Sequence, residues 1–156
     1  QLPPALQAAM LASTTQLNLL GAELADLPGV DAATDVTGFG LLGHTLEMCR
    51  GSGLAARITA DDLPLLPEVE ALSRSGIGTG AATRNWASYG AEVILPDDFP
   101  DWRRALLCDP QTSGGLLIAA GPQAVQEVLA RAHRLGFAQA VTVGTLHGGT
   151  PRVTVS

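Results

Sequence analysis

Residues 35–44 read Asp35-Val36-Thr37-Gly38-Phe39-Gly40-Leu41-Leu42-Gly43-His44, and the rest of the chain is organised around this stretch. It combines a carboxylate, a hydroxyl and three glycines at the point where a helical pattern begins. Glycine lets a backbone approach a ligand closely, and the first N–H groups of a helix can bind an anion. Asp35 stands beside that anion site and could hold a hard cation through its oxygens. Together these features favour magnesium-bound phosphate as the ligand.

Two simpler interpretations of this stretch stay open from the residues alone. Asp35 could cap the helix, which is a common task for Asp at such a position. The glycines could shape a turn that binds no ligand at all.

The composition indicates one globular domain. The chain has 156 residues, of which 46% are hydrophobic and 15% are charged, so it can build its own core. No apolar run approaches the roughly 20 residues of a membrane helix, and no signal-peptide pattern opens the chain. The net charge of −6 disfavours nucleic acid as a main partner, because a basic face is its usual footprint.

The basic residues and the cysteines limit which reactions this chain could catalyse. All nine basic residues are arginine, so a mechanism that needs a lysine cannot be completed within this chain. Cys49 and Cys108 lack C-x-x-C spacing, which suits reduced thiols in a cytoplasmic protein. Cys49 lies on an apolar helical stripe, and we expect it to be a core thiol rather than a nucleophile.

Local patterns predict helices and strands that interleave irregularly. We expect helices over 5–20, from 41 to a stop at 51–53, and over 67–72, 102–107 and 122–135. We expect strands over 30–36, 54–58, 91–95, 116–120, 138–146 and 152–155, the last two joined by a hairpin at 147–150. A chain of this kind that ends in an antiparallel pair favours an α+β layered domain.

Two further polar segments contain closely spaced glycines. Residues 76–90 are predicted to form a long loop, which Trp86 and Tyr89 pin to the core. The polar side chains at 83–85 could contact a polyanion, although a plain surface loop is the simpler interpretation. Residues 108–115 form a polar turn that leads into the strand at 116–120.

The glycines at 38, 40 and 43 also match the G-x-G-x-x-G fingerprint of dinucleotide-binding folds. That fingerprint requires a buried hydrophobic strand directly before the first glycine. Residues 30–37 instead carry four polar side chains in eight positions. Asp35 would also repel a pyrophosphate unless a metal lay between them. The dinucleotide interpretation is therefore disfavoured.

Three blocks of sequence carry a more specific signal. They are ATDVTGFGLLGH at 33–44, TRNWASYG at 83–90 and LCDPQTSGGL at 107–116. In this order and spacing they resemble the C-terminal domain of selenophosphate synthetase (selenide, water dikinase). That family lies within the wider superfamily of aminoimidazole ribonucleotide (AIR) synthetase. Relatives usually have Phe where this chain has Trp86, which is a mild departure.

The resemblance implies a fold and an activity. The fold is a three-layer α/β/α domain of the α+β class, with a mixed, largely antiparallel sheet. The activity is the ATP-dependent conversion of selenide and water to selenophosphate, AMP and phosphate, with Mg²⁺ as the metal. Residues 1–156 would form a single AIR synthase-related C-terminal domain.

The resemblance also implies partners outside this chain. In that family an N-terminal domain supplies the glycine-rich loop, the catalytic lysine, the reactive Cys or selenocysteine and most metal-binding aspartates. We therefore expect this domain to partner its own N-terminal domain, ATP and selenide in a cytoplasmic homodimer, with no nucleic acid and no membrane. No catalytic residue is expected within this chain, and alone it should be inactive.

The site residues that the resemblance supports are few. Asp35 matches the aspartate that the C-terminal domain contributes to the magnesium–ATP site, and Thr37 and Gly38 then lie beside the phosphates. The polar residues expected to face the same cleft from the other two blocks are Asn85, Asp109 and Thr112. Two other classes remain open: a non-catalytic binding module of the same fold, and a nicotinamide-dependent enzyme.

Overall fold

The computed structural model describes residues 3–156. In that part of the chain the α-helices are α1 (Pro4–Thr15), α2 (Leu20–Leu24), α3 (Gly40–Ser52), α4 (Val69–Arg74), α5 (Gly80–Tyr89), α6 (Asp101–Leu107) and α7 (Val125–Arg134). The strands are β1 (Val30–Asp35), β2 (Leu54–Ile58), β3 (Val93–Ile94), β4 (Leu116–Ala120), β5 (Gly144–Gly148) and β6 (Val153–Val155). Short 3₁₀ helices cover Ala60–Asp62 and Gly90–Glu92.

The strands form two sheets. β1 and β4 pair antiparallel, with Asp35 opposite Leu116. The larger sheet has the order β3-β6-β2-β5, in which β2 pairs antiparallel with β5 and parallel with β6, and β3 pairs parallel with β6. The expected α+β class with a mixed sheet is confirmed. The described strand pairs divide evenly between antiparallel and parallel.

Two hydrophobic clusters hold these elements together. The larger lies between α3, α5, α6 and the four-stranded sheet, and its fully buried side chains are Leu42, Leu46, Cys49, Cys108 and Val153. The spacing of Leu42, Leu46 and Cys49 places them on one face of α3, as the apolar stripe predicted.

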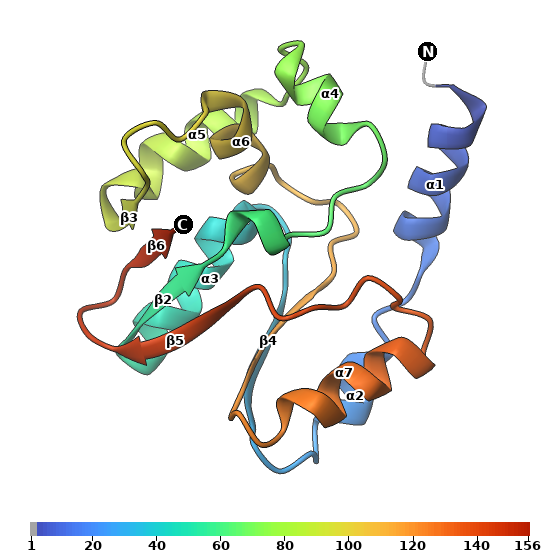
Figure 1. Cartoon of the computed structure of the whole chain (residues 1–156), viewed down its shortest axis with the longest axis vertical. Helices are drawn as coiled ribbons and strands as arrows, with labels where there is room; N and C mark the ends of the chain where they lie inside the picture. Colours follow the sequence, from blue (N-terminus) through green and yellow to red (C-terminus); the bar gives the residue numbers. More distant parts are fainter. Residues whose placement is uncertain (1–2) are drawn as a thin grey trace.

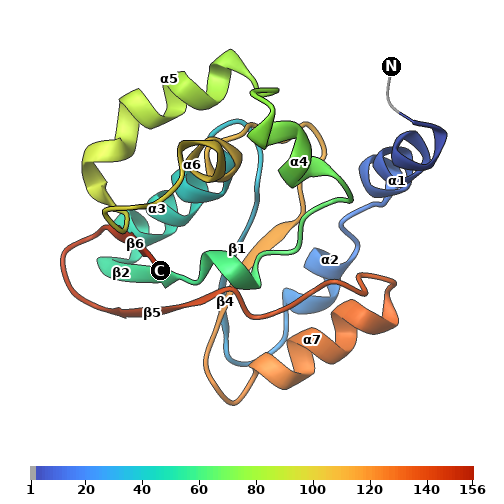
Figure 2. The same ribbon diagram turned by 45° about the horizontal axis from the view of Figure 1, so that its top comes forward.

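The smaller cluster joins α2, α7 and the β1–β4 pair through Leu20, Leu24, Val128 and Ala132. Figures 1 and 2 show α2 and α7 side by side next to this pair, with α3, α5 and α6 grouped elsewhere. α1 extends from the edge of the molecule and buries none of its residues (Figure 2).

The predicted loop at 76–90 is wrong, because most of it is helix α5. Thr79 caps this helix, since its Oγ1 accepts a hydrogen bond from the Ala82 N–H at 3.2 Å. The expected anchoring is confirmed, as Tyr89 is buried and Trp86 packs against the larger cluster. Three glycines around the cap, at positions 76, 78 and 80, gave the segment its loop-like composition.

The predicted hairpin at 147–150 is also wrong. β5 and β6 both pair with β2, which lies between them, so the intervening residues form a connection rather than a two-strand turn. The first of these strands is shorter than predicted and begins at Gly144 rather than at residue 138. Period-two alternation shows that a segment is extended, but it does not show which strand pairs with it.

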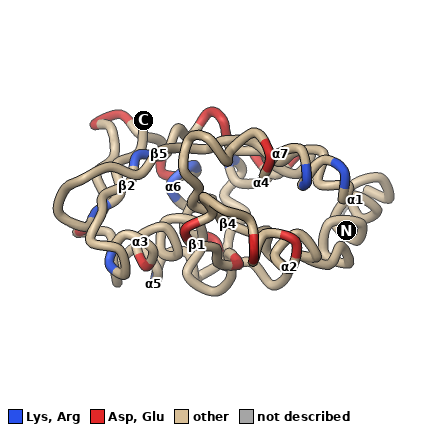
Figure 3. Tube along the Cα trace, turned by 90° about the horizontal axis from the view of Figure 1, so that it is seen from below, with Lys and Arg blue, Asp and Glu red and all other residues tan. Residues whose placement is uncertain are grey.

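Charged residues are distributed over several elements. Figure 3 shows arginines mixed with Asp and Glu along the trace, and many of them form exposed pairs such as Arg74 with Glu70 at 2.8 Å. None of the helices in the described range combines the length and apolar character that crossing a bilayer requires.

Candidate functional site

The first sequence block forms the turn between β1 and α3. β1 ends at Asp35, which is exposed, and α3 begins at Gly40 with Phe39 in the N-cap position. Within residues 3–156 no side chain caps the N–H groups of this helix. The capping interpretation of Asp35 is wrong, because the helix begins five residues after it. The N-terminal end of α3 therefore keeps the N–H groups that could face an anion.

Three consecutive carbonyls of the turn are bonded to the protein. The Thr37 carbonyl accepts hydrogen bonds from the N–H groups of Gln111 at 3.0 Å and Gly40 at 3.1 Å. The Gly38 carbonyl accepts from Asn85 Nδ2 at 2.9 Å, and the Phe39 carbonyl accepts from the Tyr89 hydroxyl at 2.7 Å. Because these acceptors are occupied, fewer carbonyl oxygens remain to repel an anion at the turn.

The Tyr89 hydroxyl is a permanent donor in this arrangement. Burial raises the pKa of Tyr89 well above its ordinary value of 10.0. The hydroxyl therefore keeps its proton across the neutral range, and the hydrogen bond to the Phe39 carbonyl persists.

Asn85 connects all three sequence blocks. Its Nδ2 donates to the carbonyls of Gly38 and Cys108, both at 2.9 Å. Two carbonyl acceptors at this distance fix the amide orientation, because the opposite orientation would place oxygen against oxygen. Asn85 is thus placed between the first and third blocks, and its two donor hydrogens are both used. Its Oδ1 is the atom left to meet a ligand.

Asp109 is held by its neighbours at the start of the third block. Its Oδ1 accepts from the Thr79 hydroxyl at 2.8 Å, and its Oδ2 lies 3.3 Å from Gln111 Nε2. Since Thr79 also caps α5, these bonds link the orientation of the carboxylate to the position of that helix. Thr112 is exposed and directly follows Gln111, whose backbone N–H donates to the Thr37 carbonyl.

Two glycines allow the first and third blocks to approach this closely. Gly40 has a φ of +68°, and a Cβ built there would lie 2.6 Å from the Cys108 backbone carbon. A Cβ on Gly114 would lie 1.6 Å from the Val36 carbonyl oxygen. Both positions therefore exclude any side chain without a backbone shift.

His44 lies below the turn, near Thr37. Its Nε2 is 3.2 Å from the Thr37 Oγ1, and its ring lies tilted against Phe39 with the centroids 5.7 Å apart. Its Nδ1 is 2.9 Å from Glu47 Oε2, but no aligned hydrogen bond reaches this nitrogen within the described residues. The buried histidine thus contacts the turn at one nitrogen and a carboxylate at the other.

The structure therefore brings together most of the predicted site residues. Hydrogen bonds join Asn85 to Gly38, and through Gln111 they join Asp109 to Thr37, whereas Asp35 and Thr112 lie exposed beside them. Three contributors were missed in the sequence: Tyr89, His44 and Thr79. A signal for Thr79 was present in the sequence, since threonine is one of the residue types preferred at a helix N-cap.

The oxygen donors here fit a hard cation in kind, since carboxylate and hydroxyl oxygens are the ligands that Mg²⁺ prefers. They do not fit it in number. Among residues 3–156 no group of three Asp, Glu, His or Cys side chains comes together as a metal site would need. Asp35 could supply one ligand of a site and not the whole of it.

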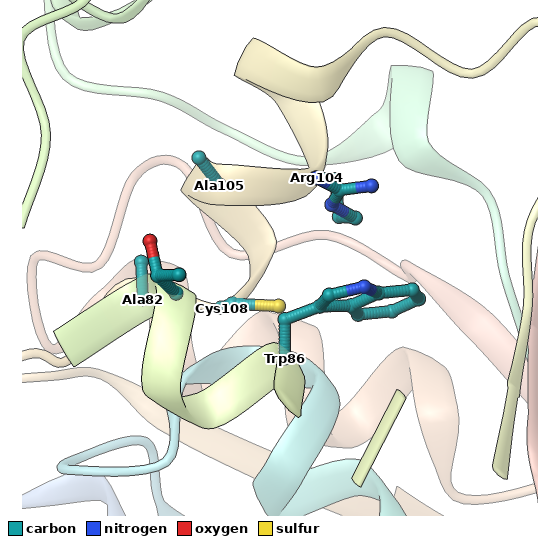
Figure 4. Close-up of a pocket in the computed structure, with 6 residues that line it drawn as sticks. Ala82, Trp86, Arg104, Ala105 and Cys108 are labelled. Carbon is teal, nitrogen blue, oxygen red and sulfur yellow. The ribbon is translucent and has the colours of Figure 1, made fainter. Parts of the chain in front are cut away.

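A separate small pocket lies between α5 and α6 (Figure 4). Its volume is about 60 Å³, and its lining includes Trp86, Arg104 and Cys108. The Arg104 guanidinium lies 5.0 Å from the centre of the Trp86 ring. Nucleotide-sized ligands need cavities of roughly 300 Å³ or more. This pocket is therefore too small to be a nucleotide site.

Both thiols are free and fully buried. Burial raises the pKa of Cys49 and of Cys108 above the ordinary value of 9.0. Reactive cysteines have lowered pKa values and are accessible, so neither thiol has the environment of a nucleophile. The expectation that Cys49 is a core thiol is confirmed.

Comparison with known proteins agrees with the resemblance that the three sequence blocks carry. The sequence profile of the family described as "AIR synthase related protein, C-terminal domain" matches residues 5–156. The chain is 56% identical over 148 residues to the "Selenide, water dikinase" of Paraburkholderia xenovorans, and this match covers 95% of this chain and 42% of that protein. It is 55% identical over 156 residues to the protein of the same name from Burkholderia ambifaria, covering 100% and 44% respectively. The Rhizobium meliloti protein of that name is 49% identical over 154 residues, covering 99% and 44%.

A solved structure supports the fold. HypE of E. coli, a hydrogenase maturation protein, superimposes with a TM-score of 0.61 at 22% identity, covering 87% of this chain and 34% of that one. At this identity the likeness concerns the fold alone. The chain spans less than half the length of the curated relatives that it matches.

Proposed function

The chain belongs to the family of AIR synthase related proteins, whose C-terminal domain it carries, and on that premise we propose that it is the C-terminal domain of a selenophosphate synthetase. In this function it completes a magnesium–ATP site at which selenide, ATP and water give selenophosphate, AMP and phosphate. Relatives that are 49–56% identical to this chain are named "Selenide, water dikinase", which supports this proposal.

One observation carries the proposal. The three sequence blocks meet at Asn85, which lies in the second block and donates to carbonyls of the first and the third. Such convergence is what a site built from separate segments requires. It also explains why the polar residues recur at these places, since each block supplies side chains beside the same turn.

Each residue has a role in the proposed site. Asp35 holds a magnesium ion, and Thr37 and Gly38 lie beside the phosphates at the N-terminal end of α3. The amide oxygen of Asn85 and the side chains of Asp109 and Thr112 face the same ligand. Phosphoryl transfer depends mainly on positioning and on charge stabilisation, so a domain can contribute without a nucleophile of its own.

The site is proposed to be shared with an N-terminal domain of the longer protein. One matching carboxylate and no lysine are too little for a magnesium triphosphate, whose charge several cations must balance. Phe39 is 52% exposed where the turn meets α3, and a covering domain would bury it. The complete enzyme is proposed to be a cytoplasmic homodimer.

The test is replacement of the proposed metal ligand in the longer protein. Asp35→Asn should lower selenide-dependent turnover roughly 100-fold or more, because charge stabilisation by a metal is worth several kcal/mol. Its effect on the melting temperature should be small, since Asp35 is exposed and caps no helix. Asp31→Asn is the matched control, because Asp31 is an exposed carboxylate on the same strand.

Two outcomes would contradict the proposal. Normal turnover in Asp35→Asn would remove Asp35 from the metal site. A longer protein that binds magnesium–ATP but consumes none with selenide would instead favour a non-catalytic module of the same fold.

A further inference from the structure

The side chains of Thr37, His44 and Glu47 form a line that ends at the turn. Thr37 Oγ1 lies 3.2 Å from His44 Nε2, and His44 Nδ1 lies 2.9 Å from Glu47 Oε2. The histidine side chain is only 9% exposed, whereas that of Glu47 is 50% exposed. A hydroxyl, an imidazole and a carboxylate in this order are an arrangement in which the carboxylate fixes the ring and the ring fixes the hydroxyl.

The carboxylate selects the tautomer of the ring. An ionised carboxylate only accepts hydrogen bonds, so a lone pair on Nδ1 at 2.9 Å would be repelled by it. In the neutral imidazole the proton therefore sits on Nδ1 and leaves a lone pair on Nε2. The contact is a close approach of 2.9 Å, and among residues 3–156 no group forms a hydrogen bond with Nδ1 as the side chains stand. The half-exposed Glu47 side chain has room to rotate toward the ring.

The ring in turn fixes the hydroxyl. With a lone pair on Nε2, the Thr37 hydroxyl can satisfy this contact only by donating its hydrogen to the ring. Its oxygen lone pairs then face away from His44. A hydroxyl held in this way accepts hydrogen bonds from a ligand and cannot donate to one. This suits a donor such as a metal-bound water better than a bare phosphate oxygen.

We propose that His44 is a positioning residue, which with Glu47 holds the Thr37 hydroxyl so that its oxygen, and not its hydrogen, faces the ligand. The proposal rests on the proposed function for the nature of that ligand. The tautomer of His44 and the orientation of Thr37 do not depend on it, because they follow from contacts within this chain.

The first test measures the tautomer in the chain itself, without any ligand. In ¹⁵N NMR spectra at about pH 8, where free imidazole is neutral, His44 should show a protonated Nδ1 and an unprotonated Nε2. The signals are assigned by their loss in His44→Gln. Glu47→Gln should shift the ring toward the other tautomer, because an amide can donate to Nδ1. A proton on Nε2 in the unchanged chain would overturn the proposal.

The second test measures whether His44 acts through Thr37. The probe is magnesium–ATP, titrated into the longer protein that contains this domain. Thr37→Val and His44→Leu should each weaken binding about threefold to tenfold, the effect of one hydrogen bond. The double variant should be no weaker than either single variant. If the two residues acted independently, the effects would multiply to about tenfold to 100-fold.

Conservative variants separate positioning from packing. Thr37→Ser keeps the hydroxyl and should recover most of the affinity that Thr37→Val loses. His44→Gln can place an amide oxygen near the former Nε2, so it should recover most of the affinity that His44→Leu loses. Equal losses in His44→Gln and His44→Leu, or multiplying effects in the double variant, would overturn the positioning role. Absence of any magnesium–ATP binding in the unchanged protein would count against the proposed function, while the NMR result would still decide the tautomer.

Discussion

Replacing Asn85 with alanine tests whether this residue is an architectural clamp or only a ligand contact. The two hydrogen bonds to the carbonyls of Gly38 and Cys108 are each worth about 1 kcal/mol net, so their loss costs about 2 kcal/mol. Alanine is a better helix former than asparagine, and position 85 lies within α5, which returns up to about 0.7 kcal/mol. We therefore expect the free energy of unfolding to fall by about 1.5 kcal/mol.

The assay is equilibrium urea denaturation of the chain, followed by thermal melting. A loss of about 1.5 kcal/mol corresponds to a fall in the melting temperature of roughly 3–6 °C for a domain of this size. The slope of the denaturation curve should not change, because the surface that unfolding exposes is nearly the same.

Two matched variants separate the lost donors from the lost volume. Asn85→Asp keeps the shape but removes both donors and sets a carboxylate against two carbonyls, and it gains no helix propensity. It should therefore be less stable than Asn85→Ala. Ser88→Ala changes an exposed residue on the same helix and should be neutral or slightly stabilising. A change below about 0.5 kcal/mol in Asn85→Ala, or an Asn85→Asp variant as stable as the unchanged chain, would refute the clamp.

Three further predictions follow from the packing and from the shared site. Gly40→Ala should lower the free energy of unfolding by more than about 2 kcal/mol, because it places a side chain on a left-handed backbone and against the Cys108 backbone. Gly51→Ala is the control and should not destabilise the chain, since its Cβ would meet nothing within 4 Å. Equal melting temperatures for the two variants would contradict this prediction. Because burial raises the pKa of Cys49 and of Cys108, their contribution to stability is complete below pH 9.0, the ordinary thiol pKa, and is lost as pH rises through the folded values. In the variant with both cysteines changed to alanine, the free energy of unfolding should decline less steeply at alkaline pH. In the longer protein this variant should keep its selenide-dependent turnover. Loss of that turnover in a folded variant would reveal a missed catalytic thiol. The chain alone should unfold cooperatively and consume no ATP with selenide, and micromolar magnesium–ATP affinity by calorimetry would show that it carries a complete site.

The elements whose evidence is local were predicted well from the sequence. The stripe through Leu42, Leu46 and Cys49 predicted α3, because burial of one helical face leaves a period that a single segment reveals. Helix α5 was missed, since the three glycines at and before its start dominated the composition of the segment. The Thr79 cap that starts this helix is a single residue, and its effect is clear only once its oxygen is seen on the Ala82 N–H.

Strand partners could not be predicted in the same way. β6 pairs parallel with β2, and the aligned residues Ala56 and Val153 lie far apart in the sequence. Alternation in either strand is compatible with several neighbours, and the choice depends on how the larger hydrophobic cluster closes. The hairpin at 147–150 failed for this reason, because proximity in sequence was taken for pairing.

The candidate site was likewise only partly predictable from the sequence. Its blocks and their polar members were visible in the sequence, because residue type alone indicates what a side chain can bind. The use of Asn85 was not visible, since its partners are two backbone carbonyls whose positions depend on the fold. The contact of Tyr89 with the Phe39 carbonyl was hidden in the same way, and the sequence indicated only an aromatic anchor.

These backbone contacts have a consequence for the energetics of the proposed site. The carbonyls of Thr37, Gly38 and Phe39 are already bonded before a ligand arrives. A flexible glycine turn would lose backbone entropy of about 1–2 kcal/mol per residue on binding. Here that cost is met during folding by contacts with α5 and the 108–115 segment, so more of the interaction with a ligand remains as affinity. The same contacts make the proposed site depend on Tyr89, which touches no ligand and acts only through the Phe39 carbonyl. Variants of Tyr89 should therefore weaken nucleotide binding through the turn.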